Sequence, residues 1–118
     1  MNHQTFAARQ KRVELSKAAP VPVQVAYTDI GHGPPVVLMH GIPTWSYLYH
    51  DVIDALASQH RVIAPDFLGH GNSDQRDVFD RSLVAQKAMV LALMDHLDLA
   101  SASLIGHDTG GGVALMMA

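Results

Sequence analysis

The apolar positions of the chain fall into short runs whose spacing changes along the sequence. Residues 12–16 and 21–28 alternate apolar and polar side chains across a proline-marked turn, which predicts an antiparallel opening hairpin. Residues 35–39 and 61–64 are largely apolar without alternation, as in strands that are covered on both faces. Residues 102–105 form another apolar run and predict the last strand.

A helical period appears between the two covered strands. Thr44 or Ser46 can cap this helix, because their hydroxyl oxygens accept from the free amides of a first turn. We expect the helix to run to about Ser58, with an apolar stripe formed by Leu48, Val52, Ile53, Leu56 and Ala57.

A second helix is expected to begin at Asp80 or Ser82 and to run through about Leu97. Its apolar face includes Leu83, Val90, Leu93, Met94 and Leu97. Strands that alternate with helices imply right-handed crossovers, and sites then gather at the carboxyl ends of the strands. We therefore predict one α/β core domain over residues 1–118, with a mostly parallel sheet after the antiparallel hairpin.

The segment Gly106-His107-Asp108-Thr109-Gly110 joins the last strand to a glycine-rich helix start. This pattern predicts a nucleophile elbow with aspartate in the position of serine. A carboxylate that attacked a carbonyl would give only a labile anhydride, so Asp108 points to displacement at saturated carbon. Gly106 and Gly110 are expected to supply the small neighbours that the tight turn needs, and the helix N-terminus favours an ionised carboxylate.

A second loop, His40-Gly41-Ile42-Pro43, follows the first covered strand. The backbone amides of Ile42 and Thr109 are the predicted oxyanion donors, because an elbow pairs the residue after the nucleophile with an early loop. Gly41 and Pro43 are expected to shape this loop, and a cis bond can precede Pro43. Alone, the same residues would be an ordinary Gly-Pro turn.

Several other side chains are weaker candidates. His40, Trp45 and His107 are possible substrate contacts, although aromatic residues at a helix start more often pack in the core. His107 is expected to pack or to form hydrogen bonds, not to act as the general base. The oxygen-rich loop over residues 66–74 does not have the spacing of a calcium loop, so we predict neither a metal site nor a cofactor.

Composition excludes several function classes. Eight Lys and Arg against eleven Asp and Glu give a formal net charge of -3, which disfavours nucleic acid as a partner. The chain has no cysteine, so disulfides and thiolate chemistry are absent. No apolar run of signal-peptide or membrane-spanning character is present, and we expect a cytoplasmic protein without a membrane partner.

The segments HGIPTWSYLY (residues 40–49), RVIAPDFLGHGNSD (residues 61–74) and GHD (residues 106–108) together resemble the α/β-hydrolase fold. The closest resemblance is to haloalkane dehalogenases, and epoxide hydrolases are almost as similar. In both families an aspartate, here matched by Asp108, attacks carbon to form an alkyl-enzyme ester that a His-activated water then hydrolyses. The resemblance implies a small apolar halogenated or epoxide substrate, with water as the second reactant.

Two positions depart from the families' pattern. Thr109 stands where both families commonly have a tryptophan, and Ile42 stands where many dehalogenases have an asparagine. The families' catalytic histidine, its acidic partner and the cap domain would all follow Ala118, so we expect this chain to be the N-terminal part of such an enzyme. Its partner would be the missing C-terminal part of the same fold. The competing interpretation is a non-catalytic fragment that binds a partner chain or an apolar ligand through an exposed last strand.

Overall fold

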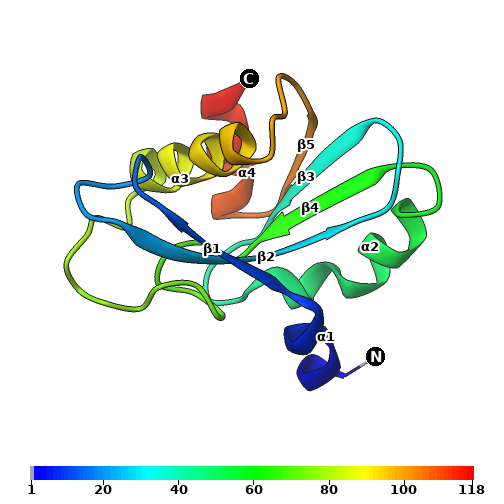
Figure 1. Cartoon of the computed structure of the whole chain (residues 1–118), viewed down its shortest axis with the longest axis horizontal. Coiled ribbons are helices and arrows are strands. Elements are labelled where there is room, and N and C mark those ends of the chain that lie inside the picture. Colours follow the sequence, from blue (N-terminus) through cyan, green and yellow to red (C-terminus); the bar gives the residue numbers. More distant parts are fainter. Residues whose placement is uncertain (1) are drawn as a thin grey trace.

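A computed structural model describes residues 2–118 of the chain. Three strands follow α1 directly, and from β3 onward strands alternate with helices, as in an α/β domain (Figure 1). In chain order the elements are α1 (His3–Arg9), β1 (Lys11–Leu15), β2 (Val23–Ile30), β3 (Pro35–Met39), the 3-10 helix η1 (Ser46–Tyr49), α2 (His50–Leu56), β4 (Arg61–Pro65), α3 (Leu83–His96), β5 (Ser103–Gly106) and α4 (Thr109–Met117).

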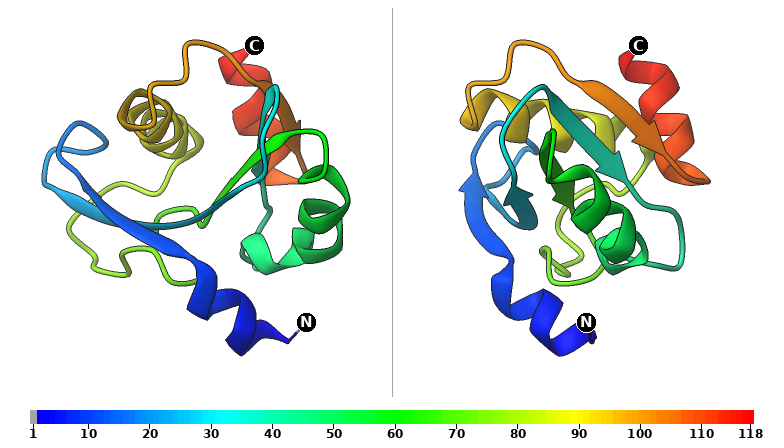
Figure 2. Two further views of the ribbon diagram at one scale, coloured as in Figure 1. Left: turned by 45° about the vertical axis from the view of Figure 1, so that its right-hand side comes forward. Right: turned by 90° about the vertical axis from the view of Figure 1, so that its right-hand side faces the viewer.

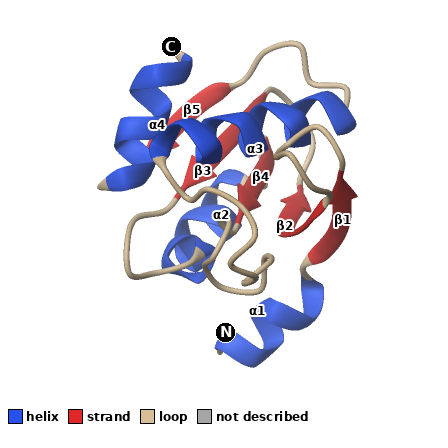
Figure 3. Ribbon diagram, turned by 90° about the vertical axis from the view of Figure 1, so that its left-hand side faces the viewer, coloured by secondary structure: helices blue, strands red, loops and turns tan. Residues whose placement is uncertain are grey.

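The strands form one mixed sheet in the order β1-β2-β4-β3-β5. β1 and β2 are the antiparallel hairpin, and β2 also runs antiparallel to β4. β3 is parallel to both of its neighbours, β4 and β5. The hairpin therefore lies at one edge of the sheet and β5 at the other (Figure 3). The carboxyl ends of β3 and β5 meet where Met39 pairs with Gly106.

Helices cover both faces of the sheet. α3 and α4 lie on one side and α2 on the other, as Figures 1 and 2 show. Alternate residues of β3 point to opposite sides, so Val37 and Met39 join the core beneath α3 while Val36 and Leu38 join the core beneath α2. This double coverage explains why β3 and β4 have continuous apolar sequences.

The strand predictions and the bounds of the second predicted helix are confirmed. Leu83, which was expected on the apolar face of that helix, is instead 39% exposed. The strand expected over residues 35–39 is β3, and the runs at 61–64 and 102–105 correspond to β4 and β5 with shifts of one residue at their ends. Ser82 is the N-cap of α3, where its hydroxyl oxygen accepts from the Ala85 amide at 3.2 Å. Short-range capping chemistry was sufficient to locate this helix.

The helix expected from Thr44 or Ser46 to Ser58 is wrong in its start and its exposed face. The segment begins as the 3-10 helix η1 and becomes α-helical only at His50, and neither hydroxyl caps it. The Thr44 hydroxyl donates to the Gly41 carbonyl, and the Ser46 hydroxyl donates to Asp66. In the expected stripe only Ile53 is fully buried, while Leu48 and Val52 are 44% and 42% exposed.

Helix α1 was not predicted from the sequence. Asn2 caps it by accepting from the Thr5 amide at 2.8 Å, and Phe6 anchors it in the core beneath α2. A single apolar anchor in so short a helix gives little periodic signal. Within residues 2–118, no helix combines the length and the apolar character needed to cross a membrane.

Candidate active site

Asp108 lies on a sharp turn between β5 and α4. Its backbone has φ 56° and ψ −119°, which a side chain with a Cβ rarely adopts and which costs about 1–3 kcal/mol. The Gly110 amide donates to the His107 carbonyl at 3.0 Å, and the Gly112 amide donates to the Asp108 carbonyl at 3.2 Å. The turn therefore presents an exposed carboxylate at the start of a helix, as an elbow requires.

Two glycines let the elbow pack backbone against backbone. A Cβ at Gly106 would lie 2.3 Å from the Gly110 carbonyl oxygen, and a Cβ at Gly110 would lie 2.1 Å from the Met39 carbonyl oxygen. Both distances are far inside van der Waals contact. The small neighbours expected around Asp108 are thus required by the close approach of α4 to the ends of β5 and β3.

The loop after β3 meets the elbow directly. A Cβ at Gly41 would lie 2.6 Å from the Asp108 Cβ and 3.1 Å from its Oδ2, so only glycine fits beside the carboxylate. Pro43 follows a cis bond, as the sequence allowed. The two predicted loops therefore come together because parallel β3 and β5 end at the same edge of the sheet.

His40 is fully buried and forms hydrogen bonds through both ring nitrogens. The Phe67 amide donates to Nε2 at 2.9 Å, so the proton is on Nδ1, which donates to the Gly41 carbonyl at 2.9 Å. Burial lowers the pKa of His40, which agrees with this neutral ring. The expected contact between His40 and a substrate has no support in this placement, because His40 holds the loop from inside.

The remaining predicted residues divide into packing and exposed positions. Trp45 packs edge-on against Phe6, with ring centroids 5.5 Å apart, so its ring belongs to the core as the simpler alternative held. His107 is exposed next to Asp108. In the described part of the chain, no residue accepts a hydrogen bond from the amides of Ile42 or Thr109.

The Thr109 side chain has an unusual environment. Its Oγ1 is buried, and no partner for it exists among residues 2–118. An unpaired buried hydroxyl costs about 1–3 kcal/mol, which is tolerated more often at functional sites than elsewhere.

Sequence reasoning missed the organising role of Asp66. This carboxylate is fully buried directly after β4 and accepts from the Ser46 amide at 2.9 Å, Gln10 Nε2 at 3.0 Å and the Asn72 amide at 2.9 Å. The Ser46 hydroxyl is a further donor. Asp66 thus ties α1, η1 and the loop after β4 together, and its oxygens are already satisfied. Among the described residues no group of three or more His, Cys, Asp or Glu side chains is arranged to hold a metal ion.

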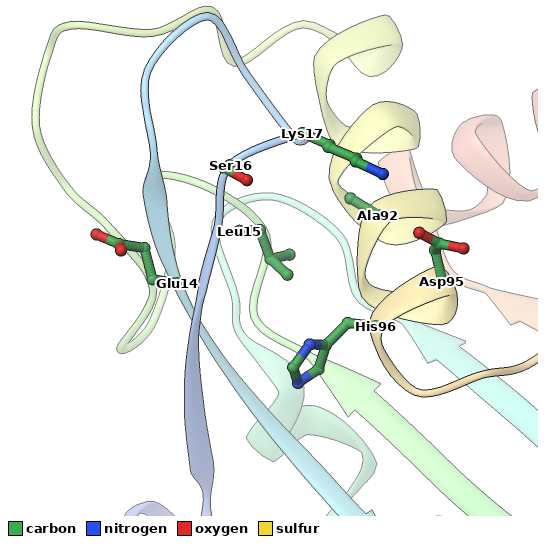
Figure 4. Close-up of a pocket in the computed structure, with 7 residues that line it drawn as sticks. All are labelled: Glu14, Leu15, Ser16, Lys17, Ala92, Asp95 and His96. Atoms are coloured by element: carbon green, nitrogen blue, oxygen red, sulfur yellow. The ribbon is translucent and has the colours of Figure 1, made fainter.

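A shallow depression of about 160 Å³ lies elsewhere on the molecule (Figure 4). Its lining comes from the end of β1 and the last turns of α3: Glu14, Leu15, Ser16, Lys17, Ala92, Asp95 and His96. β1 and β5 are at opposite edges of the sheet, so this depression is separate from the elbow. The candidate site is the exposed junction of the two loops at Asp108.

Comparison with known proteins gives a consistent result. The family described as alpha/beta hydrolase fold matches residues 34–118. Haloalkane dehalogenase 2 of Mycobacterium tuberculosis is 39% identical over 95 residues, which cover 80% of this chain and 33% of that protein. The chain thus spans about a third of the length of the curated relatives it matches.

Two solved structures show the same fold over most of the chain. The epoxide hydrolase CorEH is 33% identical with a TM-score of 0.83, and the match covers 92% of this chain and 36% of that one. An alpha/beta hydrolase fold protein from Burkholderia ambifaria is 38% identical with a TM-score of 0.75, and this match covers 79% and 34% of the two chains.

Proposed function

The chain belongs to the alpha/beta hydrolase fold family, and from that premise we propose that it is the N-terminal part of a hydrolase in which Asp108 attacks a saturated carbon. The proposed activity resembles that of haloalkane dehalogenases. One observation carries the proposal: the residue held on the strained elbow turn, against Gly41, is a carboxylate and not a hydroxyl.

In the proposed first step, one carboxylate oxygen of Asp108 forms a bond to the carbon that bears the halogen. The carbon–halogen bond breaks, and its electron pair leaves with the halide, so the product is an alkyl ester of Asp108. The amides of Ile42 and Thr109 would hold the other carboxylate oxygen. This role is supported by their position beside the elbow and by their lack of an acceptor among residues 2–118.

In the proposed second step, water attacks the ester carbonyl, the alcohol leaves, and the Asp108 carboxylate is regenerated. The attacking water needs a base, and no described histidine forms a hydrogen bond or ion pair with Asp108. We propose that a histidine and its acidic partner come from a segment that corresponds to the other two thirds of the relatives. That segment would be the polypeptide partner of this chain.

Epoxide opening is the second candidate. The similarity to the epoxide hydrolase CorEH, at 33% identity over 92% of the chain, favours it. The same carboxylate would attack a ring carbon, the ring carbon–oxygen bond would break, and the alkoxide would take a proton from water to become a hydroxyl. A candidate from another functional class is a non-catalytic fragment that binds a partner chain or an apolar ligand. It would bind through the β5 edge, where Ile105 is 41% exposed.

Intact-mass measurement separates these candidates. The chain is incubated with 1-bromobutane or with an epoxide such as styrene oxide, and Asp108→Asn is the matched control. A butyl adduct that maps to Asp108 and is absent from the Asn variant supports the dehalogenase proposal, and an adduct from the epoxide alone supports the second candidate. If neither reagent modifies Asp108, the nucleophile proposal is wrong and the binding fragment is favoured.

A further inference from the structure

We propose that the Thr44 hydroxyl, together with the His40 ring, fixes the orientation of the Gly41–Ile42 peptide and so positions the Ile42 amide for the oxyanion that would form at Asp108. The inference rests on the proposed function for its catalytic meaning, and on the hydrogen bonds of one carbonyl for its geometry. Thr44 and His40 are positioning residues, because they act through the peptide and not on a substrate.

The Gly41 carbonyl oxygen accepts an unusual number of hydrogen bonds. The Thr44 hydroxyl donates at 2.7 Å, the Thr44 amide at 3.0 Å and His40 Nδ1 at 2.9 Å. A carbonyl oxygen has two lone pairs, so these donors use its full capacity. The short Thr44 bond contributes the only side-chain hydroxyl of the set. The orientation of this one peptide unit is therefore fixed from within the loop and from the buried histidine together.

The direction of the Ile42 amide follows from that fixed carbonyl. The Gly41–Ile42 peptide is trans and planar, so its N–H points opposite to its C=O. All three donors lie on the carbonyl side, which leaves the N–H on the other side of the peptide. In residues 2–118 no group accepts from it. The Asp108 side chain lies against Gly41 in this peptide, since a Cβ at Gly41 would be 2.6 Å from the Asp108 Cβ and 3.1 Å from its Oδ2.

The His40 ring that contacts this peptide is itself held in place. His40 is fully buried, and its Nε2 accepts from the Phe67 amide in the loop after β4. The residue before Phe67 is Asp66, whose carboxylate is held by the Ser46 amide. The peptide thus cannot turn without breaking its hydrogen bonds to Thr44 and to a histidine ring that is itself held by the loop after β4. A donor that is aimed before substrate arrives needs no reorganisation during the reaction, and such preorganisation is the main source of its effect. Thr44 would contribute part of this preorganisation with a small desolvation cost, because its hydroxyl is only partly buried.

The test uses Thr44→Val, which removes the hydroxyl at nearly constant shape, and Thr44→Ser, which restores it. Thr28→Val is the matched control, since the buried Thr28 hydroxyl has no partner in the described chain and lies in β2. We expect the rate of Asp108 alkylation by 1-bromobutane to fall about tenfold in Thr44→Val, less than the 100-fold or greater loss seen when a donor is removed outright. Thr44→Ser and Thr28→Val should stay within about twofold of the wild type.

A second measurement does not depend on reactivity. The amide proton shift of Ile42 in a ¹H–¹⁵N spectrum should respond to Asp108→Asn in the wild-type and Thr44→Ser backgrounds, and much less in Thr44→Val. A wild-type alkylation rate in Thr44→Val, or an Ile42 response that Thr44→Val leaves unchanged, would overturn the proposal. If the wild type is not alkylated at all, the proposed function fails, while the amide response still decides whether Thr44 aims this N–H.

Discussion

Replacing two neighbouring glycines of α4 by alanine should have opposite effects on stability. A Cβ at Gly110 would lie 2.1 Å from the Met39 carbonyl oxygen and 2.5 Å from the His40 carbonyl oxygen, and both of these atoms are backbone. The Met39 oxygen cannot retreat easily, because it also accepts from the His107 amide at 3.1 Å and the Tyr49 hydroxyl at 2.8 Å. A Cβ at Gly111 meets nothing closer than 3.7 Å.

Gly110→Ala must therefore push α4 away from the end of β3, and we expect a loss of about 3 kcal/mol, at the upper end for overpacked sites. Gly111→Ala should gain about 0.5–1 kcal/mol, because alanine is the better helix former. In urea unfolding followed by circular dichroism, with a slope of about 1.5 kcal/mol/M, the Gly110→Ala midpoint should fall by about 2 M while the Gly111→Ala midpoint rises slightly. Equal midpoints for the two variants would refute the close-approach argument for the elbow.

Three further predictions address the interior and the acid range. Thr28→Val should raise the free energy of unfolding by about 1 kcal/mol, because it removes a fully buried hydroxyl without a partner among the described residues. A lower urea midpoint for this variant would contradict the argument. Asp66→Asn should lower the free energy of unfolding by about 3 kcal/mol in the same assay, since the new amide NH₂ would face groups that already donate to this side chain. An unchanged midpoint would contradict a stabilising role for these hydrogen bonds. The Arg76 side chain holds the pKa of the Asp74 carboxyl well below its usual value. This stabilisation is present above the unfolded pKa of about 4 and is lost as pH falls through the folded pKa, so the urea midpoints of wild type and Asp74→Asn should differ most at neutral pH and converge in acid.

The parts of the fold that the sequence predicted are those set by local chemistry. β3 matches its predicted range because a covered strand needs an unbroken apolar run, and α3 begins at Ser82 because a cap acts on its own first turn. The start of the helix that was expected at Thr44 or Ser46 was wrong for the opposite reason. Thr44 and Ser46 have the chemistry of caps, but their hydroxyls are taken by the Gly41 carbonyl and by Asp66, and the second of these partners is twenty residues away.

The candidate site shows the same division. The elbow is a local signal, since two glycines around an aspartate after a strand already describe a turn that needs small neighbours. The hydrogen bonds that Asp66 accepts are not local. Their donors are Gln10, Ser46 and Asn72, and no spacing rule connects these residues before the chain is folded. His40 shows that residue type alone does not predict a role. A histidine beside the predicted site was expected to contact substrate, but its ring is buried in the core and holds the loop.

These contacts divide the proposed reaction into two parts with different structural requirements. The groups that the ester-forming step would use all converge on the end of β3: the elbow is fixed there by backbone contacts at Gly110, and the Ile42 peptide is fixed there by hydrogen bonds to the Gly41 carbonyl. Ester hydrolysis additionally needs a base beside Asp108, which no described residue supplies through a hydrogen bond or ion pair. Under the proposed function, alkylation should therefore depend on the contacts around β3 alone. A variant such as Gly110→Ala, which separates the elbow from β3, should then lower the alkylation rate and the stability together, whereas Thr44→Val should lower the rate with little effect on stability.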